Sequence, residues 1–167
     1  MKEGKGMTKN WGQWFPLGFL VISFLLFIAS VLCYSNETVQ FYLIGVEAAS
    51  NQGNIWQCGW PLILFTIFYL CCWRYHPQYK SGDPVRFFRY EWAILVTENN
   101  ASIINRALKR CIDSINGLMQ FCGVYYYLQL YLQKPLPTGW ILPAAIIYMI
   151  VIMSMLCHQI MKANHEI

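Results

Sequence analysis

The chain has 167 residues, of which 57% are hydrophobic and only 12% are charged, about half the charged share of an ordinary soluble domain. A soluble domain of this size would leave a large apolar surface in water, so the composition excludes that class and favours a protein embedded in lipid. The net charge of +4 is too small and too dispersed for a nucleic-acid-binding protein. We therefore expect one all-α membrane domain over residues 1–167, with membrane lipids and no nucleic acid among its partners.

Four stretches are long and apolar enough to cross a hydrocarbon core of about 30 Å. They cover residues 15–34, 55–73, 115–132 and 140–157. The first span has no charge in twenty residues and follows a polar leader, so we expect a retained signal anchor and not a cleaved signal peptide. The third span is less apolar, because it contains Asn116, Gln120 and Gln129.

The basic residues are distributed unevenly around these spans. Eleven of the twelve lysines and arginines precede span one, lie between spans two and three, or follow span four, and only Lys134 lies in the turn between spans three and four. Basic residues near membrane spans are enriched on the cytoplasmic side. The pattern therefore predicts four transmembrane helices in a bacterial inner (plasma) membrane, with both termini and the 74–114 segment in the cytoplasm.

The end of span two, YLCCWRYHPQYK, contains two adjacent cysteines followed by His76, with Asp83 a little further on. These residue types can bind metals, but a metal site needs three or four converging ligands and supporting hydrogen bonds. The aromatic residues and Arg74 are also typical of a helix that leaves the membrane on its cytoplasmic side. We favour the membrane exit, and we expect neither a metal nor another cofactor.

Two helices are expected in the cytoplasmic loop. Residues 86–97, RFFRYEWAILVT, mix arginines with aromatic residues in a pattern typical of an amphipathic helix in the headgroup layer. From Ile104, apolar residues recur every three or four positions and continue into span three, which predicts one helix from Ala101 to Leu132, about 48 Å long. Its cationic face either packs within the chain or docks a cytoplasmic partner. That face carries Arg106, Lys109 and Arg110.

The seven cysteines leave at least one unpaired within the chain. Cys33 and Cys58 both lie at the outer ends of spans, so they are a candidate disulfide in an oxidising compartment. A four-helix thiol oxidase that feeds quinone resembles the chain in size and topology. That enzyme needs a C-x-x-C in its first outer loop and further cysteines in its second, and the corresponding parts of this chain lack both.

No other pattern in the sequence indicates catalysis or transport. The chain contains no G-x-S-x-G, H-E-x-x-H or phosphate-binding loop motif, which predicts a protein that is not an enzyme. The centres of the four spans carry no ionisable residue, whereas transporters usually place such residues inside the membrane. Uncharged polar residues remain, and Gln120 at mid-span is the best candidate for a hydrogen bond to a helix of another protein.

The stretch GVYYYLQLYL crowds tyrosines into the outer half of span three. Tyr125, Tyr126 and Tyr127 cannot share one helical face, because successive residues diverge by about 100°. Together with Tyr131, they either form an interfacial aromatic belt or provide a recognition surface.

In length, four-span topology and lack of catalytic motifs, the chain resembles small inner-membrane proteins that confer immunity to pore-forming bacteriocins, and the exclusion proteins with which conjugative plasmids prevent redundant transfer. The resemblance covers format alone, and no residue role is carried over. It implies a non-enzymatic protein that recognises an incoming conjugation or toxin protein in the membrane. The alternative is an integral subunit of a secretion or conjugation complex. A second copy of the chain, in a homo-oligomer, is a further candidate partner. A holin-like pore former and a membrane enzyme that acts on lipid rank below these.

Overall fold

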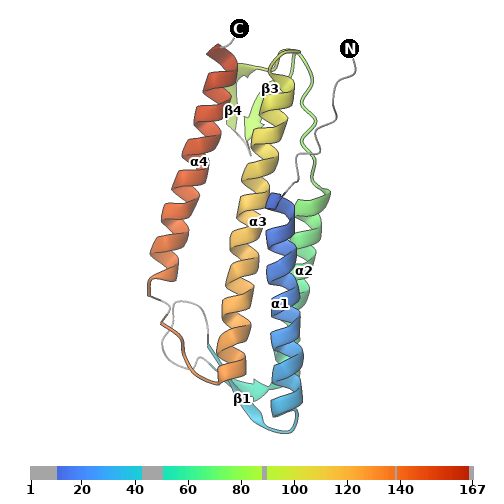
Figure 1. Cartoon of the computed structure of the whole chain (residues 1–167), viewed down its shortest axis with the longest axis vertical. Coiled ribbons are helices and arrows are strands. Elements are labelled where there is room, and N and C mark those ends of the chain that lie inside the picture. The colour runs from blue at the N-terminus through green and yellow to red at the C-terminus, as the bar shows by residue number, and fades with distance from the viewer. Residues whose placement is uncertain (1–10, 43–50, 88–89, 138, 166–167) are drawn as a thin grey trace.

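The computed structural model describes residues 11–42, 51–87, 90–137 and 139–165. Four long helices run along the long axis of the molecule, and a two-stranded antiparallel hairpin lies at each end (Figure 1). The helices are α1 (Trp11–Tyr34), α2 (Gly59–Arg74, preceded by the short 3-10 helix η1, Ile55–Cys58), α3 (Ala101–Leu132) and α4 (Ile141–His165). The hairpins are β1 (Thr38–Phe41) with β2 (Asn51–Asn54), and β3 (Pro84–Phe87) with β4 (Tyr90–Leu95).

The prediction of one continuous helix from Ala101 to Leu132 is confirmed. α3 is the central element and packs against each of the other three helices. It ends where Gln133 adopts a left-handed conformation with φ of 49°. Gln133 and Gln129 then hold the turn that follows: the Gln133 side chain donates to the Leu130 carbonyl, and the Gln129 side chain accepts from the Leu136 amide.

α1 runs parallel to the second half of α3. The rings of Phe19 and Phe121 lie 5.8 Å apart, and those of Phe27 and Tyr127 lie 5.7 Å apart, both in edge-to-face geometry. The residue numbers of the contacting rings therefore increase together along α1 and α3, as they do when two helices pack side by side in the same direction. Residues 115–132, predicted as span three, lie beside the apolar run of α1.

Three helices in the described part of the chain are long and apolar enough to cross a membrane, namely Trp14–Tyr34, Ile55–Arg74 and Ile141–Ala163. They correspond to predicted spans one, two and four. The corresponding part of α3 is less apolar, and its polar residues Asn116, Gln120 and Gln129 are buried against the other helices. The chain is thus mostly helical, and the length and composition of its apolar helices favour a membrane protein.

The prediction of an amphipathic helix over residues 86–97 is wrong, because most of this stretch belongs to the β3–β4 hairpin. Its residues are mainly aromatic, aliphatic and β-branched, which favour strands once a partner strand is available. The pairing extends beyond the two strands to Gly82, which has φ of 93°: the Gly82 amide donates to the Val96 carbonyl, and the Val96 amide donates to the Asp83 carbonyl. Val85 and Val96 are buried against α3 and α4, so the hairpin covers that end of the bundle.

The opposite end is covered by β1, β2 and η1. Val39 and Ile55 are fully buried there, in a cluster with Tyr127 and Leu130 of α3. The Gln133 side chain accepts a hydrogen bond of 2.9 Å from the Gln40 amide. The described parts of the segment between α1 and α2 thus pack over this end of the bundle; residues 43–50 lie outside the described residues.

Candidate functional site

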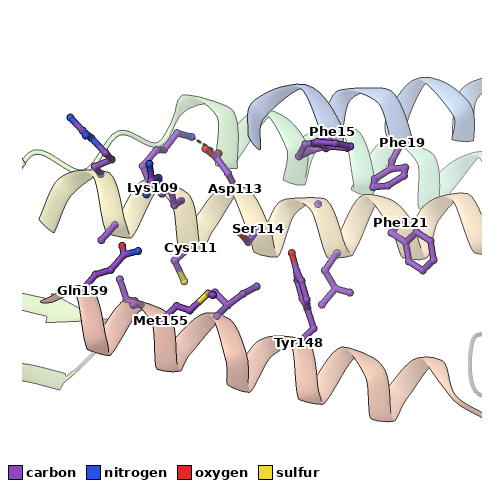
Figure 2. A pocket seen from close by; sticks show the side chains of 18 of the residues that line it. Phe15, Phe19, Lys109, Cys111, Asp113, Ser114, Phe121, Tyr148, Met155 and Gln159 are labelled. Atoms are coloured by element: carbon purple, nitrogen blue, oxygen red, sulfur yellow. Dashed lines mark hydrogen bonds and ion pairs between the residues drawn. The ribbon is translucent and has the colours of Figure 1, made fainter. Parts of the chain in front are cut away.

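A groove of about 1060 Å³ lies where α1, α3 and α4 meet. In Figure 2, α3 runs between α1 and α4; Phe15 and Phe19 reach down from α1, and Tyr148 reaches up from α4. α4 packs against α3 through its second half, where Ile152, Leu156 and Ile160 join the buried cluster. The first half of α4 has few packing partners in the described chain, which leaves the groove open between the helices.

The chemical character of the groove changes along its length. One end is lined by the exposed Arg106 and Arg110 and by His76, close to the end of α2. The other end is lined by aromatic and aliphatic side chains. These are Phe15, Phe19, Leu118, Phe121, Tyr148 and Ile152.

Lys109, the third basic residue of the predicted cationic face of α3, is bonded to other residues of the same chain. Its Nζ donates a hydrogen bond of 2.8 Å to the Asp113 carboxylate and another of 2.9 Å to the Cys72 carbonyl oxygen. Lys109 therefore ties α3 to the end of α2 and satisfies a carbonyl that the helix end leaves free. The prediction of a cationic docking face thus reduces to Arg106 and Arg110, because the Lys109 side chain is largely buried and internally bonded.

Burial raises the pKa of Asp113 above its ordinary value. The hydrogen bond and charge of Lys109, and the charge of His76, lower that pKa but only partly offset the loss of hydration. The carboxylate is paired with Lys109 Nζ at 2.8 Å, so it adds no uncompensated negative charge to the groove.

Gln120 does not lie at a surface that a second protein could reach. Its side chain is fully buried, and its Nε2 donates to the Phe65 carbonyl oxygen of α2 at 2.9 Å and to Asn116 Oδ1 at 3.3 Å. In this structure Gln120 joins α3 to α2, whereas the sequence suggested a contact with a helix of another protein. The physical reason is that a polar side chain in an apolar interior gains most from the nearest available carbonyl.

The four predicted tyrosines have different environments. Tyr127 is fully buried and its hydroxyl donates to the Cys58 carbonyl oxygen at 2.8 Å. Tyr126 packs against the same cluster. Tyr125 donates to the Pro137 carbonyl oxygen at 2.7 Å, and Tyr131 is exposed. The structure does not gather these residues into one recognition surface; only Tyr131 remains openly accessible among them.

The cysteines are free thiols in the structure. Cys33 is exposed and Cys58 is buried, and the candidate disulfide between them is not formed here, since both are free. No group of three or more His, Cys, Asp or Glu side chains that could hold a metal occurs within the described ranges. α2 ends at Arg74, as the membrane-exit interpretation of the Cys71–Cys72 segment requires.

Sequence reasoning did not identify the α1 and α4 walls of the groove. A signal for the α3 floor was present, since Arg106, Arg110, Ser114, Gly117 and Phe121 recur every three or four residues and share one helical face. Which helices would flank that face depends on packing and cannot be read from the spacing. Comparison with protein-family models, curated proteins and solved structures finds no match, so the function has to be inferred from this geometry.

Proposed function

We propose that the chain is a four-span inner-membrane protein in which residues 115–132 of α3 form the third span. Its support is the packing of this segment against α1: Phe19 meets Phe121 and Phe27 meets Tyr127. A segment packed along a membrane-crossing helix must lie at the same depth. Its low apolarity follows from buried residues such as Gln120, which face other helices and not lipid.

The proposed orientation has both termini in the cytoplasm. α1 and α3 begin, and α2 and α4 end, toward one side of the molecule (Figure 1). The described basic residues outside the 133–140 turn all belong to that side, and Lys134 belongs to the other. We call the first side the basic end. A fluorescent protein fused after residue 167 should fluoresce, and alkaline phosphatase inserted into the 134–139 turn should be active; the reverse pattern would contradict this topology.

We further propose that the protein acts without catalysis, by recognising another protein within the membrane, as immunity and exclusion proteins do. The observation that carries this proposal is the incomplete packing of α4. Ile147 and Ile150 are 61% and 62% exposed and lie on one face with the exposed Ser154. We call these three residues the outward face of α4.

Ser154 distinguishes the outward face from an ordinary lipid-facing surface. Ser23, Ser30 and Thr66, on the other apolar helices, each donate to the carbonyl four residues earlier. The Ser154 hydroxyl has no hydrogen-bond partner in the described part of the chain. Small hydroxyl residues are enriched where transmembrane helices meet, because they allow close approach and can donate across the interface. A transmembrane helix of the partner is the occupant we propose.

The test is to express the chain in bacteria and challenge the cells with conjugative donors and with a panel of pore-forming toxins. Protection against one of them supports the proposal, and the Ile150→Trp variant should then lose at least ten-fold of that protection at normal membrane abundance. Leu64 on α2 is 66% exposed, so Leu64→Trp is the matched control and should keep full protection.

Affinity purification in mild detergent separates the alternatives. A partner captured from the challenging donor or toxin, and lost with Ile150→Trp, would support recognition of an incoming protein. A constant set of host membrane proteins in stoichiometric amount would contradict it and would indicate a subunit of a standing secretion or conjugation complex.

A further inference from the structure

The floor of the groove is a single face of α3 whose chemistry is graded. Arg106 and Arg110 lie at one end, Ser114 and Gly117 in the middle, and Phe121 at the other end. At about 1.5 Å per residue, Arg106 to Phe121 spans about 22 Å. One leaflet of a bilayer, with its headgroups, is about 20–22 Å thick, being half of the 40–45 Å total. The graded face thus matches one lipid molecule in length and in order of polarity.

The position of the charged end agrees with a headgroup. Lys109, one turn from Arg106 and adjacent to Arg110, bonds to the Cys72 carbonyl at the end of the apolar run of α2. That contact fixes the level at which α2 leaves the hydrocarbon. Arg106 and Arg110 therefore lie at or just beyond the membrane interface, where phosphate groups are found.

The charge of this end is not balanced within the described chain. Asp113, the acidic residue lining the groove, is already paired with Lys109. Arg106 and Arg110 make no hydrogen bond or ion pair with other described residues. Two guanidinium groups one turn apart can each donate several hydrogen bonds to a phosphate group.

The apolar half of the groove suits a hydrocarbon chain. Phe15 and Phe19 form one wall and Tyr148 forms the other (Figure 2). Between them, Gly117 has no side chain; an added Cβ would meet only Pro16, at 3.9 Å. The floor is therefore lowest where an acyl chain would cross from the interface into the hydrocarbon region.

We propose that this groove binds one phospholipid with an anionic headgroup, taken from the leaflet at the basic end. Arg106 and Arg110 bind its phosphate region, and an acyl chain lies over Gly117 between the aromatic walls. A free phosphate or an acidic peptide would leave the apolar half empty. An uncharged helix would leave the two arginines unpaired. An anionic lipid matches both halves, so it is the occupant the charge and length favour.

The experiment is native mass spectrometry of the full-length protein in mild detergent, titrated separately with phosphatidylglycerol and phosphatidylcholine. We expect one phosphatidylglycerol to bind with at least ten-fold preference over phosphatidylcholine. The Arg106→Gln/Arg110→Gln variant should bind phosphatidylglycerol about 30-fold more weakly, since each basic residue contributes a factor of about five. The charge-matched control, Arg74→Gln/Lys80→Gln, removes two basic residues that do not line the groove and should change binding less than three-fold.

Two further measurements exclude other ligands. Gly117→Leu fills the floor but keeps both arginines, so it should weaken phosphatidylglycerol binding by about ten-fold while the protein remains folded by thermal unfolding. Inorganic phosphate at millimolar concentration should not displace the lipid. Equal binding of the two lipids, an unchanged affinity in the double-arginine or Gly117→Leu variant, or displacement by inorganic phosphate would each overturn the proposal. None of these measurements depends on the protein partner proposed above.

Discussion

Gln120 on α3 donates a hydrogen bond of 2.9 Å from Nε2 to the backbone carbonyl oxygen of Phe65 on α2, in the interior of the bundle. The same side chain leaves its Oε1 buried without a partner in the described chain. The bond therefore links two helices, but part of its benefit is offset by the unsatisfied oxygen. The gain from the bond and the cost of the unsatisfied oxygen together predict how substitutions of Gln120 change the stability of the protein.

Gln120→Met should change the free energy of unfolding by less than about 1 kcal/mol, because the lost interhelical bond is worth roughly 0.6 kcal/mol and the orphaned oxygen is removed with it. Gln120→Ala should cost about 2–4 kcal/mol, because it leaves a cavity among three helices. Thermal unfolding in detergent measures both. If Met is as costly as Ala, the hydrogen bond and not the packing dominates. Gln120→Met should also leave any protection against toxin or donor intact.

Tyr127→Phe should destabilise the protein by about 1 kcal/mol, since it removes the buried hydroxyl that donates to the Cys58 carbonyl. Tyr131 is the matched control: it is exposed, and its hydroxyl makes no hydrogen bond to another described residue. Tyr131→Phe should therefore change stability by less than about 0.5 kcal/mol. Equal effects of the two substitutions in the same unfolding assay would contradict the distinct environments described for these tyrosines.

The two glycines of α3 should respond oppositely to alanine. A Cβ at Gly123 would lie 3.2 Å from the Phe65 ring and 3.3 Å from Ser23 Oγ, so Gly123→Ala should destabilise the packing of α1 and α2 on α3 by about 1–3 kcal/mol. At Gly117 the nearest atom would be 3.9 Å away. Gly117→Ala should instead stabilise α3 by up to about 1 kcal/mol through its helix propensity. The unfolding temperatures of the two variants test this prediction. A lower unfolding temperature in both variants would show that the helices are packed differently.

Asp113 predicts a pH dependence of known sign. Its folded-state pKa is raised by burial, so its contribution to stability is fully present below its unfolded pKa and is lost as the pH rises through its folded pKa. Asp113→Asn cannot titrate. The unfolding temperature of the variant minus that of the wild-type protein should therefore increase between pH 4 and pH 7. A difference that is constant or falls over this range would show that Lys109, and not burial, has the larger effect on the pKa of Asp113.

Much of the helical framework follows from the sequence alone. Uninterrupted apolar runs predict the three membrane-candidate helices because a helix is the structure that satisfies its backbone within lipid. The regular recurrence of apolar residues from Ile104 predicts α3 with the bounds that the structure has, Ala101 to Leu132. These are properties of local spacing, and no knowledge of neighbouring elements is needed to find them.

Tertiary structure decided the rest. Residues 86–97 carry a residue mixture that fits a helix or a strand, and pairing of β4 with β3 gives the strand. Packing also decided which polar side chains stay accessible. The sequence does not separate Gln120, Tyr127 and Lys109 from accessible polar residues, but each donates a hydrogen bond to a backbone carbonyl of α2 or η1. Arg106 and Arg110 make no hydrogen bond or ion pair with other described residues, although a neighbouring face of α3 packs against α4 at the same level. A side chain's spacing sets its helical face, whereas only the packed neighbours determine whether that face meets another helix, lipid or a groove.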